Sequence, residues 1–231
     1  MSKKELPVPL IRREFIWGLR YLLFQLVFLG PLLTIVLTLI FPQVQGIHLD
    51  TAYFLVNFSA VAGIFHRFLW LSLKHGITSW PKLLLIALLG FGSYWLLSTG
   101  LDAIIHLACP EFQNINDAGI AQDSRAQFWL TAFGTVLLVP LAEETLFRGL
   151  IFGALRNKSR IIAYAVSVLL FAFVHVMGYV GIAPLHTLLL CILQYIPAGI
   201  VLAFAYEYSG SILTPILIHT AVNAVAILSM R

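Results

Sequence analysis

The chain has 231 residues, of which 60% are hydrophobic and only 10% are charged. Soluble domains usually contain about 25% charged residues, so this composition excludes an ordinary soluble domain and indicates an integral membrane protein. The formal net charge of +4 comes mostly from residues at the ends of apolar stretches. We therefore expect membrane lipid as a partner and no nucleic acid.

Apolar stretches of about 20 residues, the length that a helix needs to cross a bilayer, recur along the chain. They predict an all-α fold, a polytopic transmembrane helical bundle of about seven spans in one compact membrane domain. The connection over residues 109–126 is the only long polar one. The predicted spans cover approximately residues 15–41, 51–73, 83–108, 128–154, 161–180, 185–206 and 211–229.

Lysine and arginine residues are concentrated in connections that share one side of the predicted bundle. Since such residues are enriched in cytoplasmic loops, we expect a multi-pass plasma-membrane protein with a cytoplasmic N-terminus. The small size and the absence of eukaryotic targeting signals favour a bacterial origin. The other side carries only Arg125 and Arg231. The residues assigned to the cytoplasmic side are Lys3, Lys4, Arg12, Arg13, Lys74, Lys82, Arg156, Lys158 and Arg160.

Two adjacent glutamates, Glu143 and Glu144, lie inside the fourth predicted span. A charged side chain at mid-bilayer costs about 2.5–3.5 kcal/mol on insertion scales, so these residues need a reason to be there. On a helix Glu144 lies one turn before Arg148, which predicts a structural ion pair. Glu143 then has no local partner and is the candidate catalytic base. The alternative is a wholly structural charge cluster.

Two later predicted spans supply further polar side chains. His175 ends the pattern Phe171-Ala172-Phe173-Val174-His175, although a single histidine on an apolar helix is more often structural. His219 and Asn223 are four residues apart, so both can point at one position and donate to a developing oxyanion. Their alternative role is interhelical hydrogen bonding. Taken together, these groups predict peptide-bond hydrolysis by a water molecule held between Glu143 and His175.

The three motifs, in this order on separate spans, resemble those of the CAAX protease and bacteriocin-processing (CPBP) family. These proteins are intramembrane endopeptidases related to the Ras-converting CAAX protease. The resemblance covers roughly Gln127 to Leu228, so we expect a catalytic core over residues 127–231. Residues 1–126 form N-terminal transmembrane spans that show no family resemblance.

The resemblance implies a role for each motif residue and a class of substrate. Glu143 is the base that activates water, His175 is its partner, and His219 with Asn223 stabilises the oxyanion. Glu144 and Arg148 support the site. The implied substrate is a C-terminal or membrane-proximal peptide, prenylated or not.

Other interpretations remain open at this stage. Two histidines and a carboxylate can hold zinc with one position free for water, which would make Glu143, His175 and His219 metal ligands in a metalloendopeptidase. We favour metal-free chemistry without a cofactor, since the spacing is not His-Glu-x-x-His. A proton-coupled transporter and a non-catalytic membrane partner, such as an immunity protein, are the alternative functions.

Overall fold

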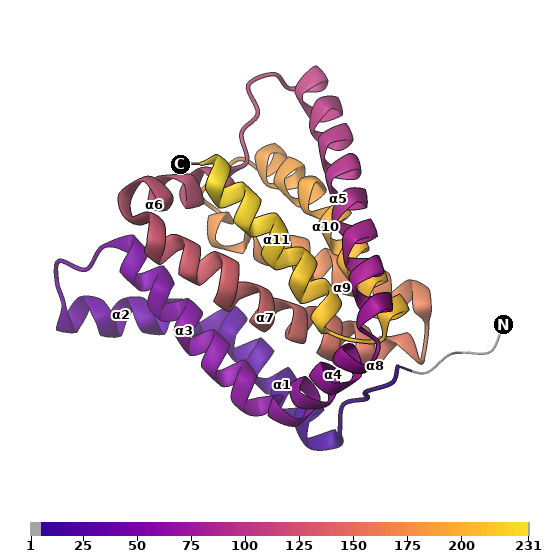
Figure 1. Cartoon of the computed structure of the whole chain (residues 1–231). Helices are drawn as coiled ribbons and strands as arrows, with labels where there is room; N and C mark the ends of the chain where they lie inside the picture. The colour runs from indigo at the N-terminus through magenta and orange to yellow at the C-terminus, as the bar shows by residue number, and fades with distance from the viewer. Residues whose placement is uncertain (1–5, 231) are drawn as a thin grey trace.

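The computed structural model describes residues 6–230, and every regular element in this range is a helix (Figure 1). The all-α prediction is therefore confirmed. Three segments are π-helical (η1, η2 and η3), and one short segment (η4) is 3-10. In chain order the elements are α1 Arg12–Phe24, η1 Gln25–Leu29, α2 Gly30–Ile40, α3 Gly46–Ile64, α4 His66–Thr78, α5 Trp80–Ala108, α6 Ile115–Ala132, η2 Phe133–Leu138, α7 Val139–Glu144, η3 Thr145–Phe152, α8 Gly153–Arg156, α9 Arg160–Val174, η4 Met177–Tyr179, α10 Leu185–Ser209 and α11 Leu213–Ser229.

Within the described range, five continuous helical segments are long and apolar enough to cross a membrane, as expected of a multi-pass membrane protein. Two shorter apolar helices, α9 and α11, occupy the positions of the other two predicted spans. The prediction of about seven spans is thus approximate. The five long segments are Arg12–Ile40, Gly46–Ile64, Trp80–Ala108, Ile115–Arg156 and Leu185–Ser209.

The second predicted span, 51–73, is wrong in its bounds because the chain breaks at Phe65, between α3 and α4. Glu14 of α1 stabilises this break. Its carboxylate accepts hydrogen bonds from the backbone N–H of Phe68 at 3.1 Å and from Arg67 at 2.7 Å. The first N–H groups of a helix have no partner within the helix, so a buried carboxylate favours a new helix start at this position.

The fifth predicted span, 161–180, is too long at its C-terminal end. Helix α9 stops at Val174, and His175 is its C-cap residue. The following turn contains Gly181 in the left-handed region, with φ of 83°, and Pro184 precedes α10. Glycine adopts this backbone conformation without strain, so the chain can turn here towards α10, and His175 lies at a helix end.

The segment η3 lies at the centre of the bundle. Every residue from Thr145 to Leu150 is buried, as expected for a helix surrounded by others. The aromatic ring of Phe147 packs edge-on against Phe171 of α9, with ring centroids 5.8 Å apart. The segment η3, which carries Arg148, thus lies within the core of the bundle.

Helices α9 and α10 approach closely at Gly199. A Cβ atom at this position would lie 2.8 Å from Val168 Cγ1 and 3.2 Å from Val168 Cα. We predict that Gly199→Ala lowers the free energy of unfolding by about 1–3 kcal/mol through overpacking, measured as a lower thermal midpoint in detergent. Gly92→Ala, where no atom lies within 4 Å of the added carbon, is the control. Equal midpoints for the two variants would contradict this packing.

Candidate active site

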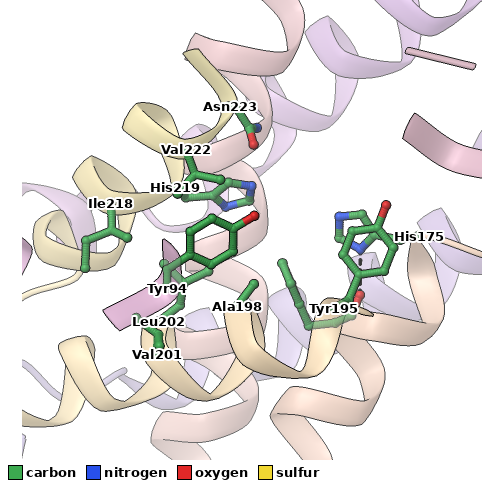
Figure 2. A pocket seen from close by; sticks show the side chains of 11 residues that line it. Tyr94, His175, Tyr195, Ala198, Val201, Leu202, Ile218, His219, Val222 and Asn223 are labelled. Carbon is green, nitrogen blue, oxygen red and sulfur yellow. Dashed lines mark hydrogen bonds between the residues drawn. The ribbon is translucent and has the colours of Figure 1, made fainter. Parts of the chain in front are cut away.

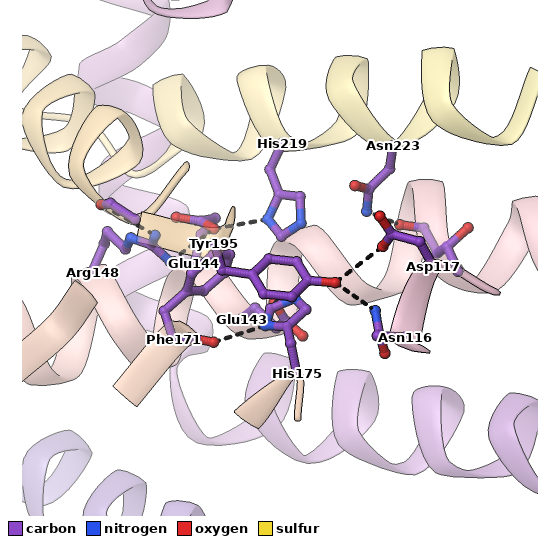
Figure 3. Close-up of polar contacts among 12 residues, drawn as sticks. Asn116, Asp117, Glu143, Glu144, Arg148, Phe171, His175, Tyr195, His219 and Asn223 are labelled. Atoms are coloured by element: carbon purple, nitrogen blue, oxygen red, sulfur yellow. Dashed lines mark hydrogen bonds and ion pairs between the residues drawn. The ribbon is translucent and has the colours of Figure 1, made fainter. Parts of the chain in front are cut away.

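Glu144 is the centre of a buried polar network that joins α7, η3 and α11. Its Oε1 accepts hydrogen bonds from Arg148 Nη1 at 3.1 Å and from His219 Nδ1 at 2.8 Å (Figure 3). The side chains of Glu144 and Arg148 are completely buried, and that of His219 is 7% exposed. The structure therefore contains the ion pair expected from the four-residue spacing, and the pair also fixes a histidine of α11.

Arg148 extends this network to two further helices. Its guanidinium carbon lies 4.1 Å from the centroid of the Phe171 ring on α9, and Nη2 is 3.5 Å from the carbonyl oxygen of Gly199 on α10. A guanidinium over an aromatic face is attracted by the ring quadrupole. Charge neutralisation by Glu144 and these contacts together explain how a full cation is accommodated in the core.

Glu143 faces a different histidine. Its Oε2 lies 3.8 Å from His175 Nε2, and the two side chains are 19% and 15% exposed. This separation is too long for a direct hydrogen bond. Within the described residues, Glu143 Oε2 is a buried oxygen without a hydrogen-bond partner. The carboxylate that lacked a local partner in the sequence therefore also has an uncommitted oxygen in the fold.

With the predicted span bounds, Glu143 and His175 would lie about 12 Å apart along the membrane normal at 1.5 Å per residue, unless helix tilt or a break near Pro140 closed the gap. In the structure the two side chains approach to 3.8 Å. The expected offset assumes that both helices cross the membrane symmetrically. Instead, the segment carrying Glu143 is kinked at Gln127, and α9 ends at Val174. Both irregularities allow the two side chains to meet.

Backbone and carboxylate partners determine which ring nitrogen of each histidine carries a proton. His175 Nδ1 is 2.7 Å from the Phe171 carbonyl oxygen, which can only accept, so Nδ1 donates and Nε2 faces Glu143. His219 Nδ1 faces the acceptor Glu144 in the same way. It follows that His219 Nε2 can donate to a ligand only when the ring is a cation.

Asn223 donates from Nδ2 to the carbonyl oxygen of Thr135 at 2.8 Å. This carbonyl is available because of the π-helical turn η2. Val139 N–H bonds to Gly134 O, five residues back, so the next donor in this register would be Pro140, which has no N–H. Asn223 thus satisfies an unpaired backbone group and retains its second amide hydrogen.

A cavity of about 580 Å³ brings the predicted catalytic residues together. Glu143, His175, His219 and Asn223 all line it. A smaller pocket of about 70 Å³ has His175, His219 and Asn223 in its wall as well (Figure 2). Helices α3 and α5, which precede residue 127, also contribute to the wall of the larger cavity. That contribution could not be recognised from the sequence, where these helices carry only scattered polar residues.

Tyr195 of α10 is a site residue that the sequence did not reveal. Its ring stacks on His175 with centroids 4.2 Å apart and an interplanar angle of 27°. Its hydroxyl donates to Asp117 at 3.0 Å and accepts from Asn116 at 3.0 Å (Figure 3). Tyr195 therefore holds the His175 ring in place. A tyrosine in an apolar helix gives no signal of this role until its neighbours are known.

The alternative zinc set does not fit the geometry. Among residues 6–230, no group of three His, Cys, Asp or Glu side chains is arranged to hold a metal ion. His219 already directs Nδ1 at Glu144.

Residues 125–225 match the family model described as type II CAAX prenyl endopeptidase Rce1-like. That match confirms the resemblance to the CAAX-protease family. A curated relative, UPF0177 protein YxdF of Lactococcus lactis subsp. lactis (strain IL1403), is 26% identical over 154 residues, which cover 65% of this chain and 80% of the relative. No solved structure matches the chain significantly. The Rce1-like match supports a CAAX-protease-like intramembrane peptidase.

Removal of the Arg148 cation tests the network. We predict that Arg148→Met lowers the free energy of unfolding by about 3–5 kcal/mol, because Glu144 is then left as an uncompensated buried charge. The double variant Glu144→Gln/Arg148→Met should be more stable than Arg148→Met alone. Thermal unfolding in detergent measures both. A double variant that is as unstable as the sum of the two single variants would argue against direct pairing.

Proposed function

We propose that this protein is an intramembrane endopeptidase that hydrolyses a peptide bond with water activated by Glu143 and His175. The observation that supports this proposal is the uncommitted Glu143 oxygen, 3.8 Å from His175 Nε2, in a cavity large enough for an extended peptide. A water molecule between the two groups would be within hydrogen-bond reach of both.

In the proposed reaction, Glu143 takes a proton from this water, and the hydroxide oxygen attacks the peptide carbonyl carbon. His175 Nε2 orients the water, because its Nδ1 is committed to the Phe171 carbonyl. The carbonyl π bond opens to a tetrahedral oxyanion. Glu143 then returns the proton to the departing nitrogen as the C–N bond breaks, which gives a carboxylic acid and an amine.

The oxyanion would be stabilised by His219 and Asn223. Since His219 Nδ1 donates to Glu144, its Nε2 can donate only from a doubly protonated ring, and the Glu144 carboxylate stabilises that cation. The second amide hydrogen of Asn223 supplies another donor. Preorganised donors of this kind act strongly in a cavity with restricted water access. No cofactor takes part in this mechanism.

The proposed substrate is a C-terminal or membrane-proximal peptide, with or without a prenyl group. We further propose that the protein resides in a bacterial plasma membrane with its N-terminus in the cytoplasm. The substrate proposal determines the assay: purified protein in detergent is incubated with prenylated and unprenylated peptides.

We predict that Glu143→Gln lowers kcat by about 10²–10⁴-fold, the usual contribution of a general base, while the protein remains folded. Glu111→Gln is the matched control, since Glu111 is exposed in the connection before α6. Peptide cleavage is followed by mass spectrometry. Full proteolysis by Glu143→Gln would exclude Glu143 as the base. A non-catalytic partner or a transporter would show no cleavage by the wild-type protein either.

Treatment with a metal chelator distinguishes this mechanism from zinc chemistry. We expect the wild-type rate to stay unchanged in excess chelator, because only protein groups and water are required. Loss of activity that returns on addition of zinc would contradict the metal-free mechanism and favour metal binding by the same residues.

The oxyanion site has its own test. We predict that Asn223→Leu lowers kcat by about 10²–10³-fold, the typical cost of removing one such donor, with little change in KM. Steady-state cleavage rates against peptide concentration measure both constants. A rise in KM at constant kcat would instead assign Asn223 to substrate binding.

A further inference from the structure

The cavity extends from the interior of the helical bundle towards one of its ends. Its outer part is lined by the first halves of α3 and α6, the end of α9 and the second halves of α5 and α11, and it reaches inward past the middle of α10 to Glu143 of α7. Figure 1 shows the end of α11 and the connection from α5 to α6 on the same side of the molecule, away from α4 and α8. Any peptide that reaches Glu143 through the mouth of this cavity therefore enters from this end.

Charge is strongly segregated between the two ends of the bundle. The cavity wall contains no lysine or arginine among the described residues, whereas four aspartates line it: Asp50, Asp102, Asp117 and Asp123. The opposite end carries the basic segments. Two carboxylates of this end are neutralised, since Glu14 pairs with Arg67, and Glu207 pairs with Arg156 and Arg160. The basic residues of this end are Arg12, Arg13, Lys74, Lys82, Arg156, Lys158 and Arg160.

Because lysine and arginine are retained on the cytoplasmic side of membrane proteins, this segregation orients the site as well as the chain. We propose that the cavity opens to the non-cytoplasmic face and that the substrate is a polypeptide segment exposed on that face. That this segment is a substrate rests on the proposed function, whereas the orientation of the cavity does not depend on the proposed function.

This orientation discriminates between substrate classes. A prenylated chain end in the cytosol would have to cross the bilayer before it reached Glu143. A free C-terminal carboxylate would also meet aspartates in the cavity wall without an arginine or lysine to bind it, which is electrostatically unfavourable. An exported peptide, or an outward-facing segment of a membrane protein, meets neither obstacle.

The chain contains a natural reporter for the test. Cys109 is an exposed free thiol that directly follows α5 at the cavity end, and Cys191 is buried. Intact cells that express the protein are treated with a membrane-impermeant maleimide before and after permeabilisation. Ser98→Cys in a Cys109→Ser background probes the cavity wall itself. Lys158→Cys in the same background is the control at the basic end.

We expect Cys109 and Ser98→Cys to react in intact cells and Lys158→Cys to react only after permeabilisation. Reaction of Cys109 only after permeabilisation would overturn the proposal, as would a Ser98→Cys variant that stays unreactive in intact cells. Labelling requires no proteolysis. An outward-open cavity in a protein that cleaves no peptide in detergent would therefore contradict the proposed function and leave the orientation intact.

Discussion

Burial of one ion pair in an apolar core constrains the rest of this structure. A buried guanidinium is tolerated when an opposite charge pairs with it. Arg148 pairs with Glu144 and contacts Phe171 and Gly199, while its Nε has no hydrogen-bond partner among the described residues. These partners belong to three different helical segments. The need to neutralise Arg148 thereby fixes how α7, α9 and α10 pack, and the same carboxylate recruits His219 from α11.

Irregular helix geometry then shapes the reactive part of the site. The π-helical turn η2 and Pro140 together leave the Thr135 carbonyl for Asn223. The early end of α9 brings His175 to Glu143. Such π-bulges are frequent at functional sites because they re-aim groups that a regular helix would keep paired. The packing around Arg148 thus holds the helices in place, while the irregular turn η2 and the end of α9 position Asn223 and His175 in the same site.

Motif spacing predicted the Glu144–Arg148 pair, because residues four apart on a helix are neighbours on the same face. Hydropathy predicted the all-α class and, approximately, the spans. It could not locate the break at Phe65, which depends on Glu14 about 50 residues earlier. Tyr195 was equally inaccessible, since its role arises from stacking on His175 across helices. Contacts between distant segments are not encoded in local periodicity.

The central claim is that two adjacent glutamates have separate tasks: Glu144 holds the bundle together and Glu143 remains available for chemistry. Thermal midpoints of purified Glu143→Gln and Glu144→Gln, recorded side by side in detergent, test it most directly. The account predicts that Glu144→Gln unfolds several degrees below wild type, because the Arg148 and His219 contacts lose their carboxylate, whereas Glu143→Gln stays near wild type. Equal midpoints, or a larger loss for Glu143→Gln, would contradict it.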